Sequence, residues 1–143
     1  ELGLLGIGVP TEFGGMGMQF NTSVLICDRI SGANGSFSTA FGAHTGIGTL
    51  PIQLYGNKEQ REKYLPKLAS GEWMGCYCLT EPGAGSDANS GKTKAVLTDD
   101  GKHYLITGQK MWISNAGFAD VFIVFARIED DKNITGFILE KGM

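Results

Sequence analysis

The chain has 143 residues, of which 42% are hydrophobic and 19% are charged, and its net charge is -3. This composition suits a folded chain with a buried core and excludes wholesale disorder. There is no basic tract, and no apolar run approaches the roughly 18 residues that span a bilayer, so a general nucleic-acid binder and a transmembrane helix are disfavoured. The chain begins with Glu1-Leu2-Gly3 and not with Met, so we expect a piece of a longer protein.

Helices are expected up to about residue 72. A glycine-rich loop over 10–17 precedes a helix that starts near Asn21 and ends at Gly32–Gly35. A second helical stretch over 36–55 is rich in small residues, which indicates close packing against other backbone. Pro51 is expected to kink or restart that stretch.

A third helix is expected after Asn57. Asn57 and Gln60 have the spacing of a capping box, and Gly71 is a typical C-terminal residue. The residues expected to face inward from this helix are Tyr64, Leu65 and Leu68.

Strand patterns replace helical ones after residue 72. The candidate strands are residues 73–79, 92–98, 103–107, 109–114, 120–128 and 134–140. The turn Asp99-Asp100-Gly101 between two of these runs predicts a hairpin. Helices followed by consecutive strands predict an α+β fold with antiparallel strands.

Cysteine and histidine positions give no metal-binding pattern. Cys27, Cys76 and Cys78 lack CxxC spacing and are predicted to be free, mostly buried thiols in a reducing compartment, with Cys76 and Cys78 on one face of a strand. His44 is expected to be packed in the interior and His103 to be exposed beside a turn. We therefore predict no metal site.

Two phosphate-binding patterns are present only in part. Residues 83–88 fit a loose G-x-G-x-x-A pattern, but Pro82 precedes them and no helical pattern follows. Gly91-Lys92-Thr93 matches the end of a P-loop, but Ser86 occupies the position of the required first glycine. We predict neither site.

The stretch from Cys76 to Asp87 places a glycine-rich acidic loop after a predicted strand. Its backbone N–H groups and the hydroxyls of Thr80 and Ser86 suit a flat polar ring edge or a phosphate. A tight turn between strands explains the same residues equally well, with Asp87 accepting from backbone N–H groups. The residues alone leave both interpretations open.

A second cluster covers residues 108–117. If 109–114 is a strand, Trp112 and Ser114 point to one side of it, where an indole could cover a planar cofactor and a hydroxyl could bond its edge. A core tryptophan near a turn is the simpler explanation for this cluster taken alone.

Together the two clusters resemble the acyl-CoA dehydrogenase family, which are FAD-dependent enzymes. Residues 77–87 (YCLTEPGAGSD) resemble the first family signature almost residue for residue, and residues 108–115 (GQKMWISN) resemble the second flavin-contact segment at a matching separation. The resemblance implies the C-terminal part of the N-terminal helical domain over 1–72. It implies the first part of the middle β-barrel domain over 73–143, without the C-terminal helical domain.

The resemblance also implies a cofactor site in the first segment. Tyr77, Leu79 and Thr80 would line the flavin, with the Thr80 hydroxyl near the N1/O2 edge, where a donor stabilises negative charge as the ring accepts hydride. Gly85 and Ser86 would approach the ribityl-pyrophosphate region, and Ser86 would also contact acyl-CoA.

In the second segment the resemblance implies that Trp112 covers one face of the flavin and that Ser114 lies near N5. The family often has Thr at the latter position, and Ser keeps the hydroxyl. The family's catalytic base is a glutamate of the C-terminal domain, so we expect no catalytic residue in this chain. Glu81 is expected to be structural.

The implied reaction is α,β-dehydrogenation of an acyl-CoA thioester, with electrons passing to an electron-transferring flavoprotein. The resemblance further implies a homotetramer, in the cytoplasm of a bacterium or the mitochondrial matrix of a eukaryote. The piece of 143 residues alone is expected to be inactive. The alternatives are an acyl-CoA oxidase or flavin monooxygenase on the same fold, or a non-catalytic remnant.

Overall fold

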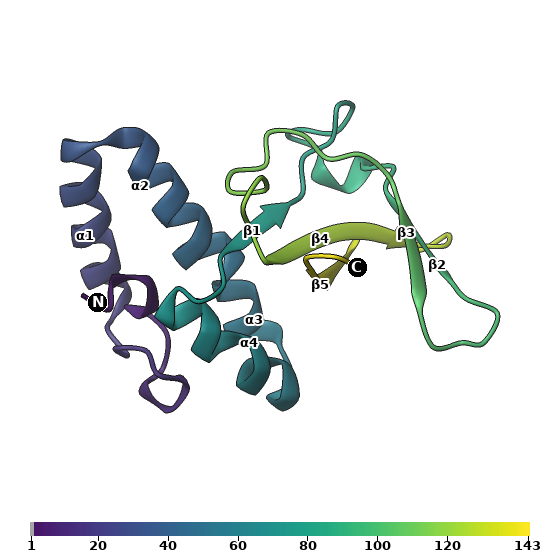
Figure 1. Ribbon diagram of the computed structural model, residues 1–143. Helices are drawn as coiled ribbons and strands as arrows, with labels where there is room; N and C mark the ends of the chain where they lie inside the picture. The colour runs from purple at the N-terminus through teal and green to yellow at the C-terminus, as the bar shows by residue number, and fades with distance from the viewer. Residues whose placement is uncertain (1) are drawn as a thin grey trace.

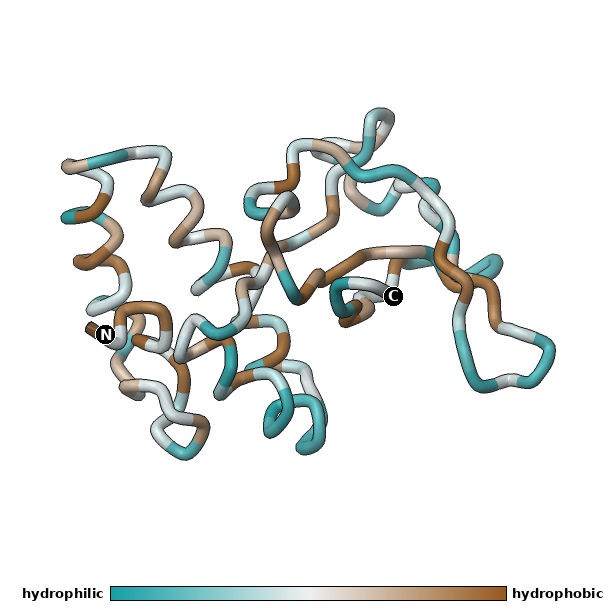
Figure 2. Tube along the Cα trace, in the orientation of Figure 1, coloured by the Kyte–Doolittle hydropathy of each residue, from teal (hydrophilic) through white to brown (hydrophobic). Residues whose placement is uncertain are grey.

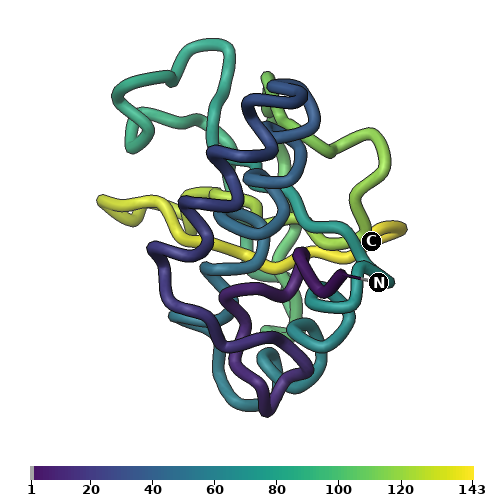
Figure 3. The backbone as a smooth tube through the Cα atoms, turned by 90° about the vertical axis from the view of Figure 1, so that its left-hand side faces the viewer, coloured from purple at the N-terminus to yellow at the C-terminus, as the bar shows by residue number. Residues whose placement is uncertain are grey.

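A computed structural model describes residues 2–143. Helices occupy the first half of the chain and a five-stranded sheet occupies the second half, with β1 (Gly75–Cys78) next to the helices (Figure 1). Seen from the helical side, α1 (Phe20–Ala33) lies nearest the viewer and the strands lie behind it (Figure 3). The predicted α+β class is confirmed.

The first helix differs slightly at its start from the prediction. Its N-cap is Gln19, and the side chain of Asn21 accepts a bond from the amide of Thr22 inside the first turn. The end predicted at Gly32–Gly35 is present, because Asn34 leaves helical geometry and its side chain caps α2 (Gly35–Gly42).

The helical stretch predicted over 36–55 is present and restarts at Pro51 as expected, but the sequence did not predict its π-helical turn. It consists of α2, a π-helical segment at Ala43–Gly48, and α3 (Leu50–Tyr55), which has Pro51 in its first turn. The wider π turn brings the backbone of Gly48 onto Gly75, where an added Cβ would lie 2.8 Å from a carbonyl carbon. Side-chain periodicity carries no signal for this contact between distant glycines.

Helix α4 (Lys58–Ser70) follows the prediction closely. Both bonds of the capping box between Asn57 and Gln60 are formed, each 2.9 Å long, and Gly71 ends the helix with a φ of 80°. The predicted inward residues are all buried: Tyr64, Leu65 and Leu68.

Strand pairing is mixed, so the expectation of antiparallel strands throughout is wrong. The hairpin of β2 (Lys94–Leu97) with β3 (Tyr104–Thr107) and the pair of β4 (Val121–Ile128) with β5 (Thr135–Glu140) are antiparallel. Both β1 and β2 run parallel to β4. The alternation of apolar and polar residues within one strand does not reveal which distant strand it pairs with or in which direction.

β1 and β2 lie end to end along the same side of β4. The amide of Val121 donates to Met74 next to β1, and the amide of Arg127 donates to Thr93 next to β2, and amides an even number of residues apart point to the same side. The residues between β1 and β2 therefore form a loop that separates two strands lying in one line along β4.

The strand predicted over residues 109–114 does not form in the described structure, where this segment is a loop. Trp112 and Asn115 have φ values of 59° and 70°, which a strand does not allow. The segment is held by hydrogen bonds to other loops instead of by a ladder.

The main core joins α4 to the sheet. Leu65 and Leu68 are fully buried against Val121 and Ile123 of β4, the strand whose hydropathy stands out in Figure 2. Full burial of each such side chain contributes roughly 2 kcal/mol, so this seam fixes the sheet on the helices. Within the described residues, no helix is both long and apolar enough to cross a membrane.

Candidate functional site

The two segments predicted to form the site lie against each other. The amide of Met111 donates to the carbonyl of Thr80 at 3.0 Å, and the ammonium of Lys110 donates to the carbonyl of Leu79 at 3.1 Å. The loop that follows β1 is thereby joined to the loop that carries Trp112, although about 30 residues separate them in sequence.

Glu81 is the centre of this junction. Its carboxylate accepts from the Lys110 ammonium at 2.7 Å, from the amide of Lys92 at 2.6 Å and from the amide of Thr93 at 3.1 Å. The exposed fractions of the Glu81 and Lys110 side chains are 7% and 13%. The carboxylate of Glu81 therefore joins three loops, which meet between the end of β1 and the start of β2.

The charge state of Glu81 follows from these bonds. Burial alone would raise the pKa of this carboxyl, but the Lys110 ammonium and the amides of Lys92 and Thr93 outweigh burial and lower its pKa to about 2. A carboxylate of such low basicity with its oxygens occupied is a poor proton acceptor. The geometry agrees with the structural role predicted for Glu81.

Two glycines make room for this junction. A Cβ on Gly108 would lie 2.3 Å from Oγ1 of Thr93, and a Cβ on Gly91 would lie 2.9 Å from Oε1 of Glu81. Neither contact is possible between real atoms, so the close approach of the loops needs glycine at both positions.

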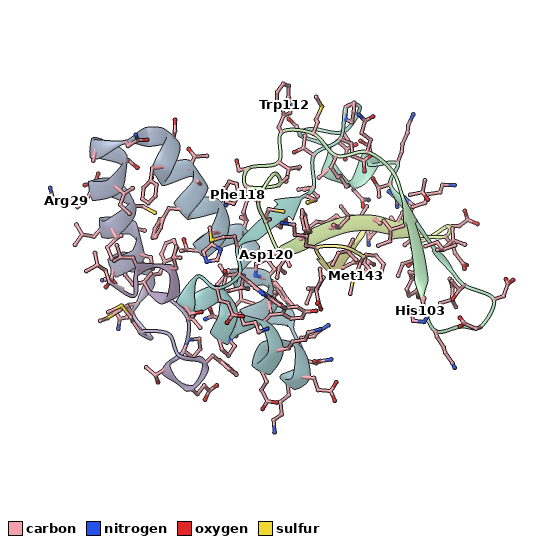
Figure 4. All side chains as sticks on the ribbon, in the orientation of Figure 1. Arg29, His103, Trp112, Phe118, Asp120 and Met143 are labelled. Carbon is pink, nitrogen blue, oxygen red and sulfur yellow. The ribbon has the colours of Figure 1, made fainter. Side chains whose placement is uncertain are left out.

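Trp112 lies at the surface of its loop, with 83% of its side chain exposed, and points away from the sheet in Figure 4. Ser114 is exposed on the same loop, while Ile113 packs toward the buried Cys76 and Cys78. The prediction that Trp112 and Ser114 share one side of a strand is wrong, because no strand forms there. A core tryptophan is excluded as well.

Tyr77 lies apart from the other predicted residues. Its ring packs on Phe125 with centroids 5.0 Å apart, in a cavity of about 540 Å³ between the sheet and helices α3 and α4. None of the other six predicted site residues lines this cavity. Burial raises the pKa of the Tyr77 hydroxyl, which keeps it neutral.

Gly85 and Ser86 lie in the exposed part of the loop, beyond the bridge between Glu81 and Ala84. Asp87 was predicted to accept from backbone N–H groups through its carboxylate, and this prediction is wrong. The backbone carbonyl of Asp87 accepts from Ser90, and within residues 2–143 no hydrogen bond uses its carboxylate. The loop is anchored instead by the guanidinium of Arg127, which donates to the carbonyl of Asn89.

The exposed groups of this region fit a flat cofactor with a polar edge. Within residues 2–143, the hydroxyls of Thr80, Ser86 and Ser114 make no hydrogen bond, and the indole of Trp112 covers nothing. Unused donors beside an exposed aromatic ring are the groups that bind such a ring system.

Cys76, Cys78, His44 and His103 lie as their sequence interpretation predicts. Cys76 and Cys78 are buried free thiols with sulfurs 3.8 Å apart, and His103 is exposed on the β2–β3 hairpin (Figure 4). His44 is fully buried. No group of three His, Cys, Asp or Glu side chains among the described residues could hold a metal ion.

Lys110 is the residue that sequence reasoning missed. It lies inside the second motif, but only its distance to Glu81 in the folded chain gives it a role. A basic residue next to Met111 and Trp112 in a segment assigned as a strand was the available signal, since a buried lysine requires a partner.

Comparison with known proteins bears on this site. Residues 1–72 match the acyl-CoA dehydrogenase N-terminal domain family, and residues 76–143 match the acyl-CoA dehydrogenase middle domain family. A probable acyl-CoA dehydrogenase of Bacillus subtilis is 56% identical over 141 residues, which cover 99% of this chain and 23% of that protein. The human mitochondrial very long-chain specific acyl-CoA dehydrogenase is 45% identical over 150 residues, covering 99% of this chain and 23% of that protein.

The crystal structure of a Bacillus anthracis acyl-CoA dehydrogenase complexed with FAD superposes with a TM-score of 0.94 at 52% identity. The match covers 99% of this chain and 24% of that one. The chain thus spans about a quarter of the length of the relatives it matches. Both family matches, the close relatives and the shared fold lead to one conclusion: the chain belongs to the acyl-CoA dehydrogenase family.

Proposed function

We propose that this chain forms the flavin-binding and acyl-CoA-binding part of an acyl-CoA dehydrogenase that acts on acyl-CoA thioesters in fatty-acid oxidation. The bond from the Met111 amide to the Thr80 carbonyl carries the proposal, because it unites the two segments that the family resemblance assigns to the flavin. In this proposal residues 1–72 end the N-terminal helical domain and residues 73–143 begin the middle domain.

The proposed cofactor is FAD, which supplies a hydride acceptor when bound. The Thr80 hydroxyl would donate to the N1/O2 edge of the ring, and Ser114 would lie near N5. Trp112 would cover one face of the ring and exclude water from it. Gly85 would let the backbone approach the ribityl-pyrophosphate, where Ser86 would bond both cofactor and acyl-CoA.

For Leu79 and Tyr77 the proposal assigns apolar contact with the flavin. Leu79 lies in the loop that Lys110 holds, which agrees with such a contact. Tyr77 lies deeper, in the cavity behind β1 that no other proposed flavin residue lines, so the geometry does not support its proposed contact.

Glu81, the carboxylate next to Thr80, does not have the geometry of a catalytic base. Glu81 is engaged by Lys110 and by two amides. The proposal therefore takes the α-proton acceptor from outside residues 2–143, and the 143-residue chain alone is expected to give no turnover. The proposed partners are acyl-CoA and an electron-transferring flavoprotein, within a homotetramer in the bacterial cytoplasm or the mitochondrial matrix.

The test is anaerobic mixing of the intact, FAD-loaded protein with acyl-CoA thioesters of graded chain length. We expect bleaching of the visible flavin absorbance and formation of the 2-enoyl-CoA. Thr80→Ala should lower the rate of bleaching by about 10- to 100-fold, because it removes a donor to the developing charge. Thr107→Ala, at an exposed threonine of β3, is the matched control and should leave the rate unchanged.

A protein that binds FAD but shows no bleaching with any thioester would refute the dehydrogenase proposal and favour a non-catalytic module. Fast reoxidation of the reduced protein by oxygen would assign it as an oxidase instead.

A further inference from the structure

The buried ion pair of Glu81 and Lys110 joins the two proposed flavin segments, although neither residue is among those proposed to contact the flavin. Thr80 stands between the two residues that Lys110 holds, Leu79 and Glu81, and Met111 follows Lys110 directly. Three hydrogen bonds from residues 110–111 therefore reach Thr80 and its two chain neighbours.

We propose that Lys110 and Glu81 are positioning residues that set the distance between the Thr80 loop and the Trp112–Ser114 loop, and thereby the fit of the flavin. The inference rests on the proposed function, because these two loops are the segments proposed to bind the flavin.

Three bonds give the pair this effect. The Lys110 ammonium reaches the Leu79 carbonyl and the Glu81 carboxylate together, at 3.1 and 2.7 Å. These two acceptors lie on either side of Thr80, so the ammonium clamps the turn that presents its side chain. The third bond, from the Met111 amide to the Thr80 carbonyl, then brings Trp112 to a fixed distance from that turn.

The opposite end of the carboxylate gives the clamp a rigid base. The amides of Lys92 and Thr93 donate to Glu81, and the carbonyl of Thr93 accepts from Arg127 of β4. The positions of Glu81 and Lys110 are thus fixed relative to β4, because β2 begins to pair with β4 at this point. Loops alone would leave the two flavin segments free to move apart.

Burial makes the ion pair sensitive to single substitutions. Removing one partner leaves a buried charge uncompensated, whereas removing both partners is close to neutral for stability. This difference separates a positioning role from a merely structural one. Lys110→Met and Glu81→Gln/Lys110→Met both remove the clamp, but only the single variant leaves a buried carboxylate without a counter-charge.

The experiment measures three properties of the intact protein with each variant: thermal stability of the apoprotein, FAD affinity by fluorescence titration, and the visible circular dichroism of bound FAD. In both variants we expect FAD affinity to fall by about tenfold or more and the visible circular dichroism to change. The double variant should recover most of the melting temperature that Lys110→Met loses, without recovering FAD affinity. Lys94→Met, at an exposed lysine of β2 with no ion pair, is the matched control and should match wild type in all three.

Hydrogen exchange of the apoprotein tests the clamp without any cofactor. The Met111 amide should exchange about tenfold faster or more in the double variant, while amides of the β4–β5 ladder exchange as in wild type.

Wild-type FAD affinity, dichroism and Met111 exchange in the double variant would overturn the inference and leave the proposed function standing. If the double variant recovered FAD affinity together with the melting temperature, this would also overturn the inference, because the ion pair would then only stabilise the fold. A wild-type protein that binds no FAD would refute the proposed function itself, and the inference with it.

Discussion

At the scale of single residues, Glu81 makes the stability of the chain depend on pH. Its pKa is about 2 in the folded state against 4.5 for a free glutamate, since bonds from Lys110 and two amides favour the carboxylate. The unfolded chain therefore binds the proton more readily than the folded chain. The stabilisation is complete above about pH 4.5 and is lost as the pH falls from there toward about 2.

We expect this single group to remove on the order of 3 kcal/mol of unfolding free energy across that window. Denaturant unfolding of the intact protein at a series of pH values measures the slope. Glu81→Gln should be less stable at neutral pH and should flatten the slope, whereas Glu62→Gln, at an exposed glutamate of α4, should keep it. An unchanged slope in Glu81→Gln would contradict the assignment.

The residue scale also shows how far the sequence could predict the site. The hydroxyls of Thr80 and Ser86 were identified from a loop pattern, and the structure leaves them without partners among residues 2–143. The conformation of Trp112 was missed, because a strand-like run of letters hides a residue with a φ of 59°. Its φ depends on the bond between Met111 and Thr80, which no local pattern encodes.

At the scale of elements, the π-helical segment Ala43–Gly48 sets how closely the helices approach the sheet. A Cβ at Gly48 would lie 2.8 Å from the carbonyl carbon of Gly75 and 2.9 Å from the carbonyl oxygen of Ala43. Backbone atoms cannot yield as a flexible side chain can. We expect Gly48→Ala to destabilise the protein by about 1–3 kcal/mol, as overpacking does.

The matched control is Gly46→Ala in the same segment, where an added Cβ meets nothing within 4 Å. That change should be neutral or raise stability by up to about 1 kcal/mol, since alanine favours helical backbone. Thermal unfolding of both variants gives the comparison, and equal effects would argue against the contact between Gly48 and Gly75.

Elements with local signals were predictable, and those with distant partners were not. The capping box of α4 and the β2–β3 hairpin each lie within a few residues of sequence, and both are present. The parallel pairing of β1 and β2 with β4 depends on residues far along the chain. The same distinction applies to the π-helical turn within 36–55, which contacts β1 and has no local signal in the sequence.

At the scale of the whole molecule, His44 joins the helical half to the sheet. Its Nε2 donates to the carbonyl of Leu68 in α4 at 2.9 Å, and its Nδ1 accepts from the amide of Gly75 in β1 at 3.0 Å. These partners fix the neutral tautomer, because a carbonyl only accepts and an amide only donates. Burial lowers the pKa of His44, and the bond to Leu68 offsets part of that effect.

We expect His44→Phe to cost about 1–3 kcal/mol, because it leaves the buried amide of Gly75 unpaired, while the Leu68 carbonyl keeps its bond from the amide of Gly71. His103→Phe, at the exposed hairpin, should change stability by less than about 0.5 kcal/mol. The wild-type protein should lose stability as the pH falls below 6.5, where unfolded His44 gains a proton that the folded form resists. Urea unfolding at pH 7.5 and 5.5 measures both effects, and a His44→Phe variant that kept the wild-type pH dependence would contradict this account.

The parallel pairing of β1 with β4 also has a consequence for synthesis. Each residue of β1 leaves the ribosome 46 residues ahead of its partner in β4, since Gly75 pairs with Val121, which at roughly 5–20 residues per second is a delay of about 2–9 s. During that delay the two thiols of Cys76 and Cys78, which are buried in the finished protein, face the surrounding solution. The nascent chain thus passes through a stage in which it can be oxidised or captured by a chaperone at a place where the completed fold is closed to both.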